Sequence, residues 1–151
     1  MSSRKIEDLH YSLQKIACDL ITNLKREGID IIITCTWRSP TEQQILYNQG
    51  RTAPGYIVTH AQGGESMHNF ILNNRPSSLA FDVVPIVNGK PYWTTNGAGF
   101  KLWQAIGAEG KLLGLDWAGD WPEAKREYAH FQLNRESIKN VENDRKASQR
   151  T

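Results

Sequence analysis

The chain has 151 residues, of which 39% are hydrophobic and 23% charged, a balance typical of one soluble globular domain with a real core. The formal net charge of +2 is too small to indicate nucleic acid as the main partner. Residues 1–9 are polar and charged, so no signal peptide is visible, and no apolar run reaches membrane-spanning length. We therefore expect a protein that is made in the cytoplasm without an export signal.

Two cysteines, Cys18 and Cys35, lie within apolar runs of the sequence. Their separation is not that of a metal-binding pair, and two cysteines make no disulfide framework. We expect both to be buried free thiols.

The first third of the chain predicts a helix followed by a strand. Apolar residues recur at steps of three and four from Ile6 to Leu24, which predicts one amphipathic helix that ends at Gly28. Residues 29–37 are apolar and β-branched, which predicts a buried strand.

A second helix has a clear start in the sequence. Ser39 can cap it, Pro40 suits its first position, and Glu42 is placed to complete a capping box. We expect this helix to run to about Asn48 and to end at Gly50.

The middle of the chain predicts a long loop and then a hairpin. Residues 51–65 are rich in glycine and threonine and have little periodicity, and such a segment in a small domain is often functional. Residues 79–87 read as a strand, and Asn88-Gly89 predicts a tight turn after it.

The last third predicts a helix over 100–113, interrupted in its middle by Gly107 and Gly110, and a short strand over 129–133. Residues 136–151 form a polar C-terminal tail, either a surface helix or disordered. This mixture lacks a regular βαβ alternation, so we expect an α+β fold: a single domain with a small antiparallel sheet flanked by helices.

Three separate segments carry the chemistry. They contribute the imidazoles of His68 and His130 and the carboxylate of Asp82, with a further carboxylate at Glu127. Three such ligands leave the fourth position of a tetrahedral zinc ion open for water, and Glu127 could accept the water's proton. The spacing matches no compact metal motif, so ordinary surface or hydrogen-bonded histidines stay an alternative. Asp82 is harder to explain without a partner, because a carboxylate inside an apolar strand is costly unless paired or metal-bound.

Taken together and in order, these segments resemble the D,D-peptidase/L-alanyl-D-glutamate endopeptidase family of zinc peptidases (peptidase M15), which includes VanY-like carboxypeptidases and phage endolysins. The resemblance covers about residues 36–133 and rests on these segments: Trp37-Arg38-Ser39, Gln49-Gly50-Arg51-Thr52, Glu65-Ser66-Met67-His68-Asn69, Ala80-Phe81-Asp82-Val83-Val84-Pro85, Gly114-Leu115-Asp116-Trp117-Ala118-Gly119-Asp120-Trp121 and Glu127-Tyr128-Ala129-His130-Phe131.

The resemblance implies a zinc peptidase domain over 1–135 with a hedgehog/D,D-peptidase-like fold. His68, Asp82 and His130 would hold Zn²⁺. Glu127 would be the catalytic acid/base, and Arg38 would stabilise the oxyanion at the scissile carbonyl. For Arg38 the alternative is a structural role in bracing its loop.

The sequence departs from the family pattern between the first two ligands. His68 and Asp82 are 14 positions apart, because residues 73–78 form a polar insertion, and Ser78 stands where the family has glycine. Such an insertion costs little closure entropy, so the site can survive it, and the insertion could form a rim that narrows the substrate groove.

Further residues have weaker assignments. We expect Ser66, Trp117 and Trp121 to line a groove for a peptide stem, with core packing as the alternative for the tryptophans. His60 is either a solvated loop residue or an accessory ligand, and His10 is expected on the surface of the first helix.

The leading hypothesis is a monomeric, endolysin-like L-alanyl-D-glutamate endopeptidase that cuts peptidoglycan peptide stems, with no nucleic-acid or integral membrane partner. It would act on the bacterial cell wall after release through a phage holin-type pore. The alternatives are a D-alanyl-D-alanine carboxypeptidase or dipeptidase with the same zinc chemistry, and a non-catalytic wall-binding or virion module of the same fold.

Overall fold

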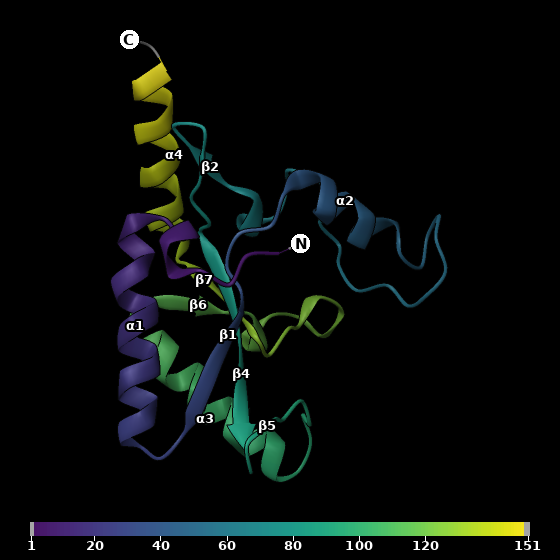
Figure 1. The fold of residues 1–151 in the computed structure, drawn as a ribbon, viewed down its shortest axis with the longest axis vertical. Helices are drawn as coiled ribbons and strands as arrows, with labels where there is room; N and C mark the ends of the chain where they lie inside the picture. The colour runs from purple at the N-terminus through teal and green to yellow at the C-terminus, as the bar shows by residue number, and fades with distance from the viewer. Residues whose placement is uncertain (1, 150–151) are drawn as a thin grey trace.

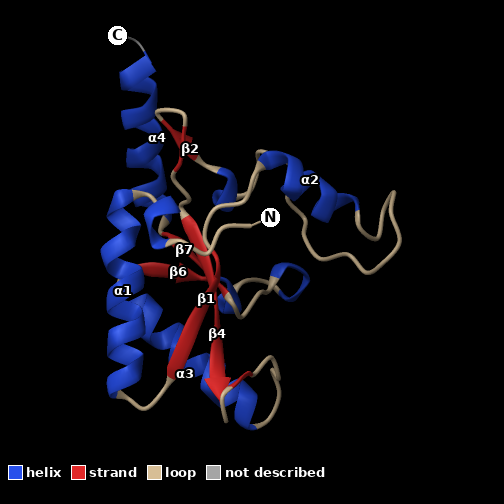
Figure 2. Cartoon of the chain, viewed as in Figure 1, coloured by secondary structure: helices blue, strands red, loops and turns tan. Residues whose placement is uncertain are grey.

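Figure 1 shows the chain as a computed structural model, which describes residues 2–149. Helices α1 and α3 pack against the central sheet on one side, whereas α2 and the segment after it project from the other (Figures 1 and 2). In chain order the elements are η1 (Ile6–Asp8), α1 (Tyr11–Arg26), β1 (Asp30–Cys35), α2 (Pro40–Asn48), η2 (Met67–Asn69), β2 (Ile71–Leu72), β3 (Arg75–Pro76), β4 (Ala80–Val87), β5 (Lys90–Pro91), α3 (Ala98–Leu112), β6 (Leu115–Trp117), η3 (Ala118–Asp120), η4 (Glu123–Lys125), β7 (His130–Leu133) and α4 (Arg135–Gln149).

The sheet has the strand order β1-β4-β7-β6, with β5 paired to the end of β4, and each of these pairings is antiparallel. The predicted α+β fold with a small antiparallel sheet is therefore confirmed. The turn between β4 and β5 is also as predicted, since Asn88 and Gly89 both have positive φ values, of 53° and 75°.

Two glycines let α3 lie close against the sheet. A Cβ atom at Gly107 would lie 2.3 Å from the Trp117 ring, and one at Gly110 would lie 2.2 Å from Cε1 of Phe131. Each glycine weakens the isolated helix by about 1 kcal/mol relative to alanine. The close packing of both aromatic rings, each buried in the core, offsets this cost.

The predicted first helix begins later than expected. The chain forms the short η1 at Ile6, and then Leu9 pairs with Ser78 as a bridge before α1 starts. His10 is the N-cap of α1: its Nδ1 accepts from the backbone N–H of Ser12 at 3.2 Å, and the residue is buried. The prediction of a surface His10 is wrong, because this imidazole takes the capping role usual for serine or aspartate.

The cysteine prediction is correct for one residue only. Both thiols are free, but Cys18 is exposed on α1, whereas Cys35 is buried at the end of β1.

The C-terminal segment is helical as far as the structure describes it. Helix α4 packs on the core through Val141, which is 8% exposed. Residues 150 and 151 of the predicted tail lie outside the described residues. Within residues 2–149, no helix combines the length and apolar character needed to cross a membrane.

Candidate active site

The sheet places three side chains in one row. Cys35 on β1 is opposite Asp82 on β4, and Asp82 is opposite His130 on β7. Directly opposite residues of neighbouring strands share a face of the sheet, so these three side chains are neighbours. His68 reaches the same place from η2, where Ser66 caps the turn.

The two histidines and Asp82 converge on a single point. Nε2 of His68 lies 3.2 Å from Oδ1 of Asp82 and 3.2 Å from Nδ1 of His130. Nδ1 of His130 lies 3.1 Å from the same Asp82 oxygen. A tetrahedral zinc ion with Zn–N and Zn–O distances of about 2.0–2.1 Å holds its ligand atoms roughly 3.3 Å apart. The spacing of the three atoms therefore fits one face of a zinc tetrahedron.

Hydrogen bonds on the far side of each ring fix which nitrogen is free. Nδ1 of His68 donates to the backbone oxygen of Thr36 at 2.7 Å, and Nε2 of His130 lies 2.9 Å from Oε1 of Gln132. The two converging nitrogens are then lone-pair acceptors when the rings are neutral, as is the Asp82 carboxylate. Three acceptor atoms this close together require a proton or a cation between them. Hydrogen-bond partners such as Thr36 and Gln132, on the other ring nitrogen, are typical of histidines that bind a metal.

The electrostatics of the site agree with a cation-binding role. Burial lowers the pKa of His68, but Asp82, with a smaller contribution from Cys35, outweighs burial and raises this pKa to about 10. Burial raises the pKa of Asp82, yet His68 and His130 outweigh it and hold this pKa well below its usual range. The convergence of a carboxylate and two imidazoles therefore favours positive charge at this point.

Glu127 lies at the edge of this cluster. Its Oε2 is 3.9 Å from Nδ1 of His130, and its side chain is about half exposed to the cleft. Burial raises the pKa of Glu127, with Asp82 adding to the effect and His130 opposing it. A carboxyl group with a raised pKa beside a cluster that could hold a metal is suited to accept and return a proton.

Arg38 faces the cluster from the short connection between β1 and α2. Its backbone N–H donates to the carbonyl of His68 at 3.0 Å, and its carbonyl accepts from Nδ2 of Asn69 at 2.8 Å. The segments that carry Arg38 and His68 are thus joined directly.

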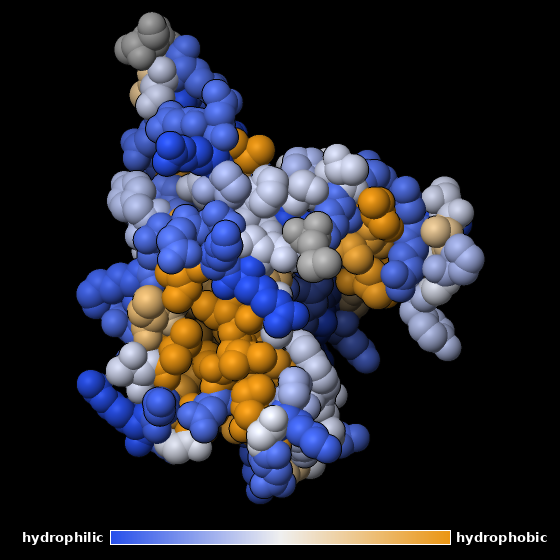
Figure 3. All heavy atoms as spheres, in the orientation of Figure 1, coloured by the Kyte–Doolittle hydropathy of each residue, from blue (hydrophilic) through white to orange (hydrophobic). Residues whose placement is uncertain are grey.

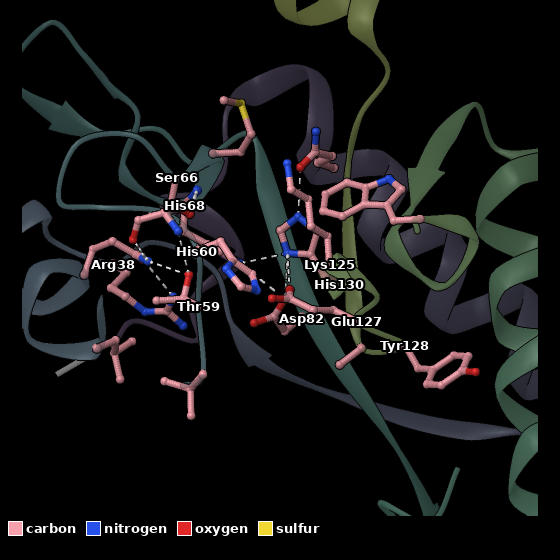
Figure 4. Close-up of a pocket in the computed structure, with 18 of the residues that line it drawn as sticks. Arg38, Thr59, His60, Ser66, His68, Asp82, Lys125, Glu127, Tyr128 and His130 are labelled. Carbon is pink, nitrogen blue, oxygen red and sulfur yellow. Dashed lines mark hydrogen bonds and ion pairs between the residues drawn. The ribbon is translucent and has the colours of Figure 1, made fainter. Parts of the chain in front are cut away.

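These residues line one cleft of about 790 Å³ (Figure 4). In this view Arg38, Thr59 and Ser66 are on one side, and Glu127, His130 and Tyr128 are on the other. The cleft has the size of a small-molecule or short-peptide site.

The sequence comparison identifies relatives of this chain. No family model matches, but the chain is 36% identical over 132 residues to the peptidoglycan L-alanyl-D-glutamate endopeptidase CwlK of Bacillus subtilis, covering 83% of this chain and 74% of CwlK. The chain belongs to this endopeptidase family.

Solved structures share the fold at lower sequence identity. The L-Ala D-Glu endopeptidase ChiX of Serratia marcescens matches with a TM-score of 0.62 at 17% identity, over 91% of this chain and 92% of ChiX. The D,D-pentapeptidase VanY, in complex with Zn(II), matches with a TM-score of 0.59 at 14% identity, over 88% of this chain and 77% of VanY. The resemblance proposed from the sequence and the D,D-peptidase-like fold are both confirmed.

The endopeptidase fold brings most of the predicted site residues together. His68, Asp82, His130, Glu127 and Arg38 all line the cleft. Which of them bind metal or act in catalysis stays a prediction.

Of the three residues predicted to bind substrate, two line the cleft and one does not. Ser66 and Trp121 line the cleft, and the Trp121 ring centroid lies 5.5 Å from that of His130. Trp117 does not line it: the residue is 2% exposed, and its indole N–H donates to the carbonyl of Tyr128. For Trp117 the core-packing alternative is correct. The missing side chains at Gly107 and Gly119 leave the space that the ring fills.

The insertion between the ligands does not form a rim. Asn73 and Asn74 have positive φ values of 52° and 61° and turn the chain between β2 and β3. Figure 1 shows this hairpin beside α4, and none of residues 73–78 lines the cleft within the described chain. Ser78, in place of the family glycine, is fully buried and bonds to Ala80.

The sequence interpretation gave no role in the site to Cys35, Gln43 or Gln132. Gln132 lies two residues after His130 on the same strand, so strand alternation alone could have placed it beside that ring. Cys35 could not be found in this way, because its position depends on the register between β1 and β4.

Cys35 offers an alternative third ligand but is less well placed. Its sulfur, a nitrogen of His68 and an oxygen of Asp82 lie within 4.8 Å of one another. However, the sulfur is 3.6 Å from Nδ1 of His68, the nitrogen that already faces Thr36. Cys35 therefore contacts the side of the ring opposite the converging atoms, and His130 is the better third ligand.

Proposed function

We propose that this chain is a zinc-dependent peptidase that cuts the L-alanyl-D-glutamate bond of peptidoglycan peptide stems. The observation that carries the proposal is the contact of three acceptor atoms at 3.1–3.2 Å beside a carboxyl group in an open cleft. The 36% identity to CwlK supports the choice of bond.

His68, Asp82 and His130 are the residues that would hold the metal. Bound zinc would polarise the scissile carbonyl and lower the pKa of a water molecule in the site. The tautomers set by Thr36 and Gln132 direct both ligand nitrogens to the same point before any metal arrives. This preorganisation favours binding, because no ring has to turn.

Glu127 moves the proton. Its carboxylate takes a proton from water as the water oxygen bonds to the carbonyl carbon, and later gives that proton to the amine nitrogen as the C–N bond breaks. Its pKa, raised chiefly by burial, brings the group nearer to neutral pH, where both transfers are possible.

Arg38 donates to the carbonyl oxygen as negative charge develops on it. The guanidinium lines the cleft together with the metal-binding cluster. A donor held ready for a developing oxyanion contributes more than the same contact in water.

The deciding experiment compares the zinc-loaded protein with Glu127→Gln on purified peptidoglycan, with released fragments identified by mass spectrometry. We expect new N-terminal D-glutamate without loss of terminal D-alanine. The variant should lose activity by about 100-fold or more while keeping its zinc, because only the proton carrier is removed.

Other outcomes assign the chain elsewhere. Release of D-alanine would place it with the D,D-carboxypeptidases, and release of the D-alanyl-D-alanine dipeptide with the D,D-dipeptidases. Fragments from no wall type, despite bound zinc, would favour a non-catalytic wall-binding or virion module. Release through a phage-type pore and the monomeric state remain predictions.

A further inference from the structure

Gln43 is a fully buried polar residue in the first half of α2. Its amide oxygen accepts from Nη1 of Arg38 at 3.0 Å. Its amide nitrogen donates to Oγ1 of Thr59 at 3.2 Å and to the carbonyl oxygen of Ala61 at 3.0 Å. The amide therefore joins the guanidinium to a segment 16 to 18 residues further along the chain.

These bonds fix the orientation of the amide. Its NH₂ group faces the carbonyl of Ala61, which can only accept, and its oxygen faces a guanidinium, which can only donate. Turned by 180°, the amide would set donor against donor and acceptor against acceptor. Glutamine is therefore the residue that satisfies both sides, and glutamate would lose the two donated bonds.

The same contacts restrict Arg38. A guanidinium has five N–H donors. Nε donates to Ser2 Oγ at 3.1 Å, one Nη1 hydrogen goes to Gln43, and one Nη2 hydrogen goes to Cys35 Sγ at 3.4 Å. Counting bonds among residues 2–149, one hydrogen on each terminal nitrogen is left for a ligand in the cleft, which Arg38 lines.

The segment on the other side of Gln43 is itself a wall of the cleft. Val58, Thr59, His60 and Ala61 all line it, and His60 is exposed. This segment belongs to neither helix nor strand, and each of its hydrogen bonds to described residues has a side chain as one partner.

We propose that Gln43 is a positioning residue that fixes the two free N–H groups of Arg38 relative to the cleft wall at residues 58–61. Gln43 borders the cleft, but its side chain is fully buried and its amide oxygen is bonded to Arg38, so it acts through Arg38. The inference rests on the proposed function, because the alignment of Arg38 with a developing oxyanion is what gives Gln43 its kinetic effect.

The neighbouring residue supplies a matched control. Gln44 also ties α2 to this segment, since its Oε1 accepts from the backbone N–H of Gly63 at 3.0 Å, and its Nε2 donates to Asn48. Within the described chain, Gln44 has no hydrogen bond to Arg38 and does not line the cleft. Gln44→Met thus removes a similar anchor without disturbing the guanidinium.

The kinetic experiment measures kcat and KM for Gln43→Met, Gln44→Met, Arg38→Ala and the double variant Arg38→Ala/Gln43→Met. We expect Gln43→Met to lower kcat by about 10- to 100-fold, less than loss of the oxyanion donor itself. KM should change little, Gln44→Met should stay within about threefold of the wild type, and the double variant should match Arg38→Ala. Equal effects of Gln43→Met and Gln44→Met, or multiplying losses in the double variant, would overturn the proposal.

A second measurement needs no substrate. In ¹⁵N-labelled protein the Nε–H signal of Arg38, assigned by its loss in Arg38→Ala, should exchange slowly with solvent. Gln43→Met and the size-conserving Gln43→Glu should alter its shift or accelerate exchange by about tenfold or more, and Gln44→Met should not. An unchanged signal in both Gln43 variants would overturn the positioning role. If the wild type cleaves no stem peptide, the proposed function fails, and this signal still decides how Arg38 is held.

Discussion

The two sides of the cleft are built in different ways. On one side, Asp82 and His130 lie on strands β4 and β7, where paired backbone bonds fix their register. On the other, the segment from α2 to η2 contains no helix or regular strand, and Tyr56 within it is 89% exposed. Figure 3 shows hydrophobic side chains exposed over α2, where Ile45 is 64% exposed.

The two kinds of cleft wall suit different functions, metal binding and substrate binding. Metal binding needs atoms held within tenths of an ångström, which a strand ladder provides. Contact with a varied peptide needs a surface that can change in sequence without loss of the fold, which a loop provides. We therefore expect changes on the sheet side to alter zinc affinity, and changes on the loop side to alter substrate affinity.

The largest predicted effect is the pH dependence of zinc binding at the cluster where His68 of η2 meets the two strand residues, Asp82 and His130. Because the pKa of His68 is raised to about 10, zinc must displace a proton throughout the range from pH 5.5 to 8.5. The apparent affinity should then rise about tenfold per pH unit, or roughly 1000-fold over this range. Competition with a chromophoric chelator measures it. A histidine with an ordinary pKa would instead give a plateau above about pH 6.5.

The same raised pKa predicts the pH dependence of stability without metal. A group whose pKa is higher in the folded state stabilises that state fully below its unfolded pKa. For His68 this contribution is complete below about pH 6.5 and is lost as the pH rises toward 10. The zinc-free protein should therefore unfold at lower urea concentration as the pH rises through this range, whereas the zinc-loaded protein should not.

A smaller effect is expected at the outer partner of His130. Gln132→Leu removes the oxygen that holds Nε2 of this ring and should lower zinc affinity by about 10- to 100-fold. Gln132→Glu restores an acceptor and should recover most of the loss. Calorimetric titration with zinc compares the three proteins, and equal affinity in all of them would show that the strand alone orients the ring.

The elements that form both walls of the cleft could largely be predicted from the sequence. The strands predicted over 79–87 and 129–133 contain Asp82 and His130, and each begins one residue before the observed strand. They could be predicted because apolar β-branched runs are strong strand signals. Helix α2 begins at Pro40 with Ser39 as its cap, as expected. These strands and the start of α2 are determined by residues close together in the sequence.

The features that were missed depend on pairing between distant segments. The row of Cys35, Asp82 and His130 follows from strand register, which alternation of residue types does not determine when both faces are buried. The break before α1 has the same kind of cause, since Leu9 leaves the helical pattern to pair with Ser78. Sequence periodicity alone cannot show such a partner.

The smallest effects are expected on the loop side. There, substitutions at two exposed residues can distinguish an effect on stability from an effect on substrate binding. Tyr56 is almost fully exposed and does not line the cleft, whereas Val58 is 48% exposed and does. Tyr56→Ser and Val58→Ser should each change the free energy of unfolding by less than about 0.5 kcal/mol, because neither is in the core. Only Val58→Ser should raise KM, by roughly fivefold, since two methyl groups would no longer contact the peptide. Urea unfolding and steady-state kinetics measure both quantities. A loss of stability in either variant would mean that the loop supports the fold, and the two sides of the cleft would then share one task.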